Sequence, residues 1–182
     1  QRGPPIRTLT LAELQRYDVG RVDPASGYGR QWPQQVASDG ERVPTLAALF
    51  ELAPTAGKPV RFNLETKITP TSGDATPDAD TFARLVVEAI RKAGVAARTT
   101  IQSFDWRTLV AVKRIAPEIA TSCITAEGGN FDTVKPDGTG RSPWHAGIAP
   151  ADHGGSVPAM ARAAGCTTWS PNFASVTRAR IG

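Results

Sequence analysis

The stretch VRFNLETKI, residues 60–68, gives the first indication of the fold. Read with the two-residue period of a β-strand, it places Val60, Phe62 and Leu64 on one face. The opposite face is polar and carries Arg61, Asn63, Glu65 and Lys67. A strand of this kind is either an exposed edge strand or a strand whose polar face lines a site.

Strands and helices alternate downstream of this stretch. Further strands are predicted at RTTIQSF (98–104), EIATSCITA (118–126) and CTTWSP (166–171). Helices are predicted after Asp78 or Asp80, after Asp105, which is placed as a helix N-cap, and over VPAMARAAG (157–165). This alternation predicts a parallel sheet with helices packed outside, joined by right-handed βαβ connections.

Each predicted strand carries polar or aromatic residues near its C-terminal end. They are Glu65 and Lys67, Gln102 and Ser103, Thr121 and Thr125, and Trp169 and Ser170. Polar or aromatic residues at the ends of four successive strands indicate that these ends meet around one site, as in a (β/α)8 barrel. A closed barrel needs eight strands and typically about 250 residues. We therefore expect an α/β chain of the TIM (β/α)8 type that forms an incomplete portion with about four strands, the other strands lying upstream and downstream or coming from another copy.

The N-terminal part does not follow this alternation of strands and helices. Thr10 with Glu13 forms a capping-box pattern, and Thr45 can cap a second short helix. A polar excursion rich in Gly, Pro and Ser, residues 21–42, separates the two. We expect one domain, 1–182, in which 1–58 is an insertion with two short helices and 59–182 form successive βα units.

Composition narrows the function classes. The chain is 40% hydrophobic and 21% charged, with a net charge of +4. It has no apolar run of roughly 18 residues, so no membrane span is expected. It also lacks a dense Lys/Arg cluster with interleaved aromatics, which argues against nucleic-acid binding. Cys123 and Cys166 show no metal-ligand spacing; two buried thiols are the favoured interpretation, and a disulfide is left open.

Glu65 and Lys67 are the first candidates for chemistry. They point to the same side of a strand and lie about 7 Å apart along it. A carboxylate there can bind a hard cation such as Ca2+ or Mg2+, and the ammonium can hold a phosphate oxygen. Together they suit phosphodiester cleavage. The alternative is a salt-bridged pair at a strand end.

Other candidates are weaker. His145 and His153, the two histidines of the chain, lie in an irregular segment from Glu127 to about Gly155 and have surface-loop surroundings. Neither has an obvious catalytic partner. Trp169 is either an aromatic wall of a pocket or a core residue.

The motifs TLAELQRYDVG, VPTLAALFEL, NLETK, TIQSFDW and TWSPN, in this order, resemble the glycerophosphodiester phosphodiesterases, over the central-to-C-terminal part of the barrel. The resemblance implies a TIM barrel that uses a divalent metal, Ca2+ or Mg2+. It implies hydrolysis of small glycerophosphodiesters to an alcohol and glycerol 3-phosphate. The resemblance also implies site roles: metal binding for Glu65, phosphate binding for Lys67, and substrate contacts for Gln102, Phe104 and Trp169.

The family's His-Arg-Gly, Glu-x-Asp and His-Asp motifs, which carry its two catalytic histidines, are expected upstream of this chain. We therefore expect no catalytic residue here and no activity of the chain alone. Two rivals are a lipid phosphodiesterase of the sphingomyelinase D type and a non-catalytic phosphoester-binding or interaction protein on a degraded barrel. A periplasmic or secreted location is expected, with a cytoplasmic one as the alternative. The sequence leaves the oligomeric state open.

Overall fold

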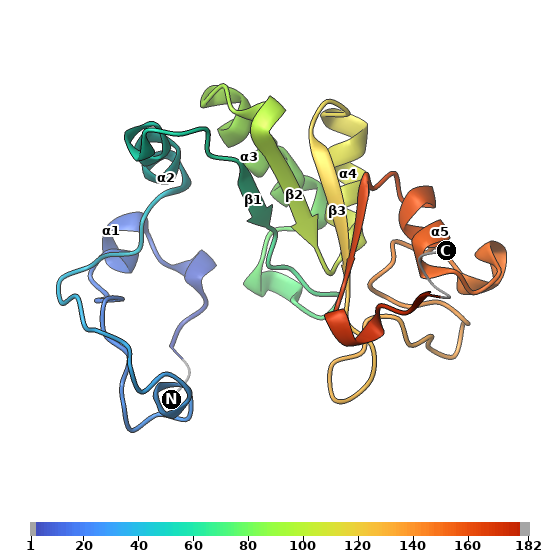
Figure 1. The fold of residues 1–182 in the computed structure, drawn as a ribbon, viewed down its shortest axis with the longest axis horizontal. Coiled ribbons are helices and arrows are strands. Elements are labelled where there is room, and N and C mark those ends of the chain that lie inside the picture. Colours follow the sequence, from blue (N-terminus) through green and yellow to red (C-terminus); the bar gives the residue numbers. More distant parts are fainter. Residues whose placement is uncertain (1–2, 179–182) are drawn as a thin grey trace. The chain divides into compact units, whose positions relative to one another are not determined.

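The computed structural model of the chain describes residues 3–178. It divides the chain into two compact units, Gln1–Ala53 and Pro54–Gly182 (Figure 1). The boundary falls at residues 53–54, a little before the expected boundary at 58–59. That the two units form one domain stays a prediction, and each unit is described by itself.

The first unit contains two short helices, α1 (Leu11–Leu14) and α2 (Leu46–Leu52). Both predicted caps are present, because the side chain of Thr10 accepts a hydrogen bond from Glu13 N and that of Thr45 accepts one from Ala48 N. Polar contacts close the excursion between the helices: the carboxylate of Asp18 accepts from Gly20 N and Gly40 N. The 3-10 helices of this unit and of its junction are η1 (Ile6–Thr8), η2 (Gly29–Gln31) and η3 (Ala53–Ala56).

The second unit is built on a parallel sheet of four strands in the order β1-β2-β3-β4. The strands are β1 (Phe62–Glu65), β2 (Thr99–Ser103), β3 (Ala120–Thr125) and β4 (Thr168–Pro171). In the register of the sheet, Glu65 lies opposite Gln102, and Gln102 lies opposite Ser122. The prediction of four parallel strands is confirmed.

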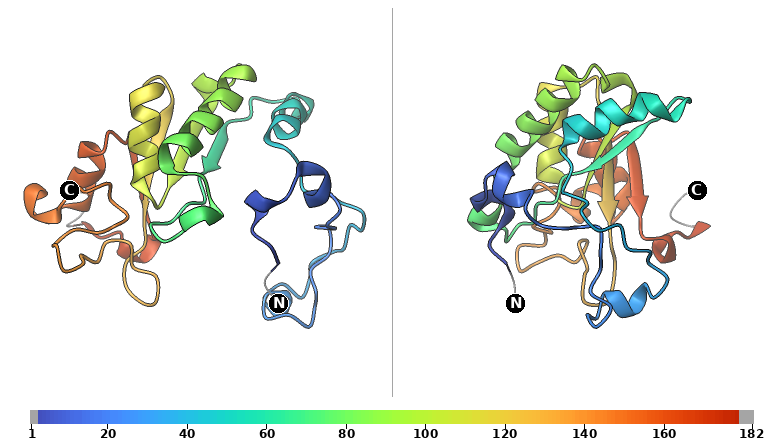
Figure 2. Two further views of the ribbon diagram at one scale, coloured as in Figure 1. Left: turned by 180° about the vertical axis from the view of Figure 1, so that it is seen from behind. Right: turned by 90° about the vertical axis from the view of Figure 1, so that its left-hand side faces the viewer.

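The described part of this unit, up to residue 178, contains three α-helices: α3 (Ala79–Lys92), α4 (Trp106–Ile115) and α5 (Val157–Ala163). Their N-caps are Asp78, Asp105 and Ser156, so the expected capping role of Asp105 is confirmed. The left view of Figure 2 shows α3 and α4 lying over one side of the strands. The remaining 3-10 helices are η4 (Gly73–Ala75), η5 (Ala96–Arg98), η6 (Pro150–His153) and η7 (Phe173–Ser175).

Burial alternates along β2 and distinguishes the two faces of the sheet there. In β2, Thr99, Ile101 and Ser103 are buried, whereas Thr100 and Gln102 are half-buried. The core lies between the buried face and the helices, with fully buried Ile90, Leu109, Val112 and Met160. The other face carries polar side chains, among them Gln102, Ser122 and Ser170, as the inward face of a barrel segment would.

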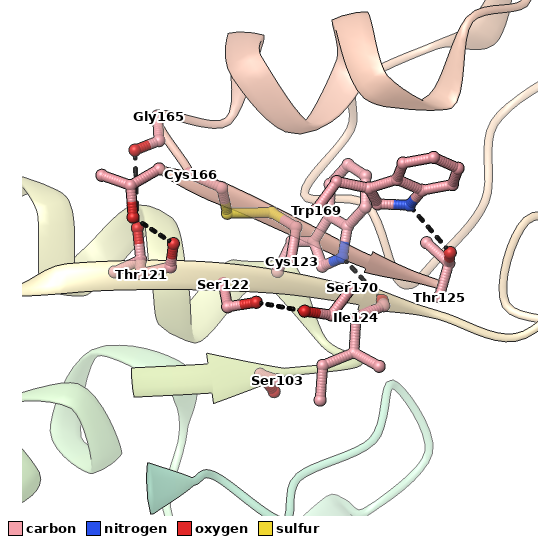
Figure 3. Close-up of a disulfide and its surroundings, with 12 residues drawn as sticks. Ser103, Thr121, Ser122, Cys123, Ile124, Thr125, Gly165, Cys166, Trp169 and Ser170 are labelled. Carbon is pink, nitrogen blue, oxygen red and sulfur yellow. Dashed lines mark hydrogen bonds between the residues drawn. A yellow bond between two sulfur atoms is a disulfide. The ribbon is translucent and has the colours of Figure 1, made fainter. Parts of the chain in front are cut away.

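A disulfide joins Cys123 in β3 to Cys166, which precedes β4 (Figure 3). The favoured interpretation of two free thiols is therefore wrong. Sequence spacing could not decide the question, because parallel pairing of β3 with β4 is what brings the two positions together. The bridge lies on the helix-covered side of the sheet, since Cys123 is fully buried and alternates with Ser122 on the opposite side.

Within residues 3–178, no helix is long and apolar enough to cross a membrane.

Candidate active site

Glu65 and Lys67 lie where β1 ends, and their side chains meet. The Lys67 ammonium is 2.8 Å from the Glu65 carboxylate. The Glu65 side chain is 22% exposed and that of Lys67 is 79% exposed. The carboxylate is thus sheltered, and the ammonium can leave the ion pair for another partner at little cost, because exposed ion pairs contribute about 0–1 kcal/mol.

A hollow of about 310 Å3 opens beside this pair. Its floor is the chain from Glu65 through Thr69, and three aromatic side chains complete its lining: Phe104, Phe131 and Trp144. The structure therefore brings together three predicted site residues, Glu65, Lys67 and Phe104. They meet at the C-terminal edge of the parallel sheet, where sites of barrel enzymes are built.

The aromatic side chains form a continuous wall. The ring centroids of Phe104 and Phe131 are 5.1 Å apart, and those of Phe131 and Trp144 are 5.5 Å apart, both edge-to-face. Sequence analysis missed Phe131 and Trp144, which belong to the irregular segment after β3. The one usable signal was position, because a long loop that follows a barrel strand lies at the site face.

Gln102 lies on the polar face next to Glu65. Its Oε1 accepts a hydrogen bond from Asn63 Nδ2 at 2.9 Å. Further along the same face, the hydroxyl oxygens of Ser122 and Ser170 are 2.8 Å apart. Gln102 thus lies opposite Glu65 in the sheet register, but it does not line the hollow.

Trp169 is placed elsewhere. It lies opposite Cys123 in the sheet register and so faces the helix-covered side, where its Nε1 donates to Thr125 Oγ1 at 3.0 Å (Figure 3). Glu65 and Gln102 belong to the other face. The structure does not bring Trp169 into the hollow, and its role as a pocket wall stays a prediction.

His145 corrects the expectation of a surface loop. It is fully buried and stacks on Trp106, with ring centroids 4.1 Å apart and an interplanar angle of 21°. Neither ring nitrogen has a hydrogen-bond partner among the described residues. Burial lowers the pKa of His145 to about 4, although the Asp132 carboxylate opposes the shift. His153, at the end of η6, is half-buried.

The His145 stack anchors the loop that carries the aromatic wall. Next to it in sequence, Trp144 O accepts a hydrogen bond from Trp106 N at 2.8 Å. The irregular segment is therefore attached to the start of α4 by a backbone bond and a ring stack. Because the stacked ring is neutral, the attachment depends on pH.

We expect acid to weaken the fold through His145. Below pH 6.5 the unfolded chain binds a proton at this site, whereas the folded chain does so only near pH 4, so stability falls as pH decreases through this window. The loss attributable to His145 is about 3 kcal/mol. Urea denaturation of wild type and His145→Phe at both ends of this pH window measures the loss of unfolding free energy. The carboxylates are common to both proteins, so their contribution cancels in the comparison. An equal loss of unfolding free energy in the two proteins on acidification would contradict the prediction.

A divalent cation fits part of this site. The Glu65 carboxylate is a hard oxygen ligand of the kind that Ca2+ and Mg2+ prefer, and the nearby Gln102 and Asn63 amides offer further oxygens. Residues 3–178 contain no group of three or more His, Cys, Asp or Glu side chains that could hold a metal ion. The described residues thus supply one carboxylate ligand, and a complete coordination shell needs others.

Comparison with models of known protein families identifies one family that the chain matches. The family model described as "Glycerophosphoryl diester phosphodiesterase family" matches residues 1–178. No curated protein matches the chain.

Two solved structures are similar. A protein from Silicibacter pomeroyi DSS-3, described as a glycerophosphoryl diester phosphodiesterase, is 28% identical with a TM-score of 0.70, over 93% of this chain and 52% of that one. A protein from Galdieria sulphuraria, described as a glycerophosphodiester phosphodiesterase, is 17% identical with a TM-score of 0.59, over 95% of this chain and 51% of that one. The chain thus spans about half the length of the solved structures it matches.

Proposed function

The chain belongs to the glycerophosphoryl diester phosphodiesterase family, and on this premise we propose that it is the central-to-C-terminal part of a barrel that hydrolyses glycerophosphodiesters to an alcohol and glycerol 3-phosphate. One observation carries the proposal: Glu65, Lys67 and Phe104 surround one hollow at the C-terminal edge of a parallel sheet. The substrate is a small molecule, and the remaining strands of the barrel lie outside the described residues.

Three residues at the sheet edge have proposed roles in binding. Glu65 is one ligand of a divalent cation, Ca2+ or Mg2+, which when bound neutralises charge on the phosphate oxygens. Lys67 exchanges its ion pair with Glu65 for a phosphate oxygen of the substrate. Gln102, on the polar face beside Glu65, contributes an amide at the edge of the site.

The aromatic wall forms the opposite side of the hollow. Phe104, Phe131 and Trp144 offer apolar surface to the part of the substrate that is not phosphate, and they shield the phosphate side from water. The described residues place no histidine around the hollow. The proton transfers at the attacking and leaving oxygens are therefore assigned to histidines outside this chain, and the chain alone is proposed to be inactive.

The experiment for this function uses the full-length protein that contains this chain, with the variant Lys67→Met. Loss of the ammonium should lower kcat/KM for a glycerophosphodiester by about 10- to 100-fold, since a hydrogen bond to a charged group contributes about 1.5–3 kcal/mol. The affinity for the cation should not fall. Steady-state kinetics and cation titration measure the two effects.

The matched control is Lys92→Met, which removes an exposed lysine at the end of α3. It should leave kcat/KM unchanged. Unchanged kinetics of Lys67→Met, or loss of the cation together with the lysine, would contradict the assigned role.

A second candidate is a protein that binds phosphoesters without hydrolysing them. It is favoured by the absence of histidine from the part of the hollow that the structure describes. A full-length protein that binds glycerol 3-phosphate and releases no alcohol from any diester would support it. Hydrolysis of sphingomyelin in preference to glycerophosphodiesters would instead support the sphingomyelinase D type.

The disulfide supports a proposal about location. Structural disulfides persist in oxidising compartments and are rare in the cytosol. A chain with a Cys123–Cys166 bridge is therefore proposed to function in the periplasm or outside the cell. Fractionation of cells that produce the full-length protein tests this, and a cytoplasmic protein with both thiols reduced would contradict it.

A further inference from the structure

The segment Thr66–Thr69 joins the site to the rest of the fold. It follows β1, lines the hollow and carries Lys67. One hydrogen bond extends the pairing of β1 with β2 into this segment, from Thr66 N to Gln102 O at 3.0 Å. The residues after Thr66 have no strand partner, so other contacts must set the direction in which Lys67 points.

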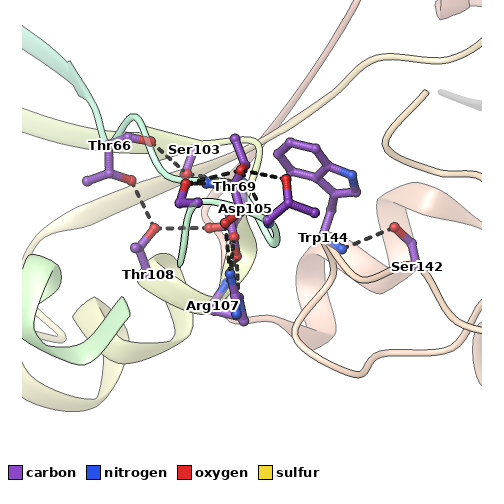
Figure 4. Close-up of polar contacts among 10 residues, drawn as sticks. Thr66, Thr69, Ser103, Asp105, Arg107, Thr108, Ser142 and Trp144 are labelled. Atoms are coloured by element: carbon purple, nitrogen blue, oxygen red, sulfur yellow. Dashed lines mark hydrogen bonds and ion pairs between the residues drawn. The ribbon is translucent and has the colours of Figure 1, made fainter. Parts of the chain in front are cut away.

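Buried hydroxyls fix the first end of this segment (Figure 4). Asp105 N donates to Ser103 Oγ, and Ser103 Oγ donates to Thr66 O, each at 3.1 Å. Thr66 Oγ1 lies 2.9 Å from Thr108 Oγ1, which in turn donates to Asp105 O at 3.0 Å. These groups are at most 3% exposed, so two hydroxyl relays tie Thr66 to Asp105 with no competition from water.

An ion pair reaches the other end of the segment. The guanidinium of Arg107 binds the Asp105 carboxylate through two bonds, Nε to Oδ1 at 2.8 Å and Nη2 to Oδ2 at 2.6 Å. The same Nη2 lies 3.4 Å from Thr69 O as a donor. The Asp105 side chain is fully buried and that of Arg107 is 41% exposed. Asp105 therefore anchors both ends, Thr66 through hydroxyls and Thr69 through Arg107.

Asp105 and Arg107 make more contacts than the N-cap of a helix requires. Capping of α4 uses one bond, from Arg107 N to the Asp105 carboxylate. A bidentate pair is geometrically specific and holds its partners in one orientation. The extra contacts all lead to the segment that carries Lys67, with buried Ile68 beside it as a further anchor.

We propose that Asp105 and Arg107, with Ser103 and Thr108, form a positioning device that orients Lys67 towards the substrate phosphate. The inference rests on the proposed function, in which Lys67 binds phosphate. Arg107 acts through Lys67 and does not itself contact the substrate. A small displacement of such a group lowers catalytic efficiency without loss of the fold.

The test is a double-mutant cycle in the full-length protein with Arg107→Met and Lys67→Met. Arg107→Met alone should lower kcat/KM by about 10- to 100-fold, the cost of misplacing a reacting contact. In the Lys67→Met background it should have almost no further effect, because two residues that act through one contact are not additive. Equal losses in both backgrounds would overturn the proposal and leave Arg107 with a purely structural role.

Arg114→Met is the matched control. Arg114 is also on α4 and also forms an ion pair, at 2.7 Å with Asp80, away from the hollow. It should not alter kcat/KM. Thr108→Val, which removes one hydroxyl relay and keeps the side-chain shape, gives the same cycle if Arg107→Met folds poorly.

Hydrogen exchange provides a readout that does not depend on catalysis. Exchange of the amides in Thr66–Thr69 should be at least about tenfold faster in Arg107→Met than in wild type or Arg114→Met, because local opening becomes easier. Unchanged exchange would overturn the positioning role. If Lys67→Met leaves the kinetics unchanged while amide exchange in Arg107→Met becomes faster, the phosphate-binding role of Lys67 is wrong, although the contacts from Asp105 and Arg107 still hold its segment in place.

Discussion

Replacing Glu65 by alanine in the full-length protein is expected to lower kcat/KM for a glycerophosphodiester by about 100- to 1,000-fold, the size of effect seen when a preorganised charge-stabilising contact is lost. The reason is that, within residues 3–178, Glu65 is the carboxylate that lines the hollow. In the proposed site, a divalent cation would then lack a ligand and the phosphate would lack the charge that the cation would supply. Initial rates measured at increasing cation concentration check the result.

Glu88→Ala is the matched control for Glu65→Ala. Glu88 also forms an ion pair with a basic side chain, Arg84, but on the surface of α3. Its removal should leave the kinetics unchanged. If Glu65→Ala recovers wild-type activity at saturating cation with no change in kcat, the carboxylate is a structural partner of Lys67 and nothing more.

Loss of the disulfide should cause the largest change in stability. The Cys123–Cys166 bridge closes a loop of 43 residues, and the loop-entropy relation gives about 4 kcal/mol for that length. Urea denaturation of wild type with and without a reductant, followed by the double variant Cys123→Ala and Cys166→Ser, measures the loss. The reductant should destabilise wild type and leave the variant unaffected.

A thiol assay on wild type unfolded without reductant provides the control, since neither Cys123 nor Cys166 should then react. Equal unfolding free energies for the oxidised and reduced protein would contradict the assigned contribution. Loss of stability at β4 and α5 ahead of β1 and β2 would further identify the bridge as the link between Cys166 and the sheet.

Local rules were sufficient to predict much of the fold. The alternation in VRFNLETKI placed β1, and the caps at Asp78 and Asp105 placed the starts of α3 and α4. These features depend on residues a few positions apart, so the sequence contains them directly. The strand-end rule placed Glu65 and Lys67 at one face. The family resemblance added Phe104, and all three residues line the same hollow.

Contacts between distant residues could not be predicted. His145 has the sequence surroundings of a surface loop, but Trp106, far away in the sequence, covers its ring. Phe131 and Trp144 reach the hollow because the irregular segment is held by its own bonds, such as Ser142 Oγ to Thr133 O. The residues alone left Trp169 open between pocket wall and core, and the pairing of β3 with β4 places it opposite Cys123.

The proposed function depends above all on the Glu65 carboxylate, which is proposed to bind a divalent cation at the edge of this sheet. Calorimetric titration of Ca2+ and Mg2+ into the full-length protein measures this binding, with Glu65→Gln and Lys67→Met as paired variants. We expect wild type and Lys67→Met to bind the cation alike, and Glu65→Gln to bind it at least about tenfold more weakly. Glu65→Gln that binds both cations as tightly as wild type would contradict the claim.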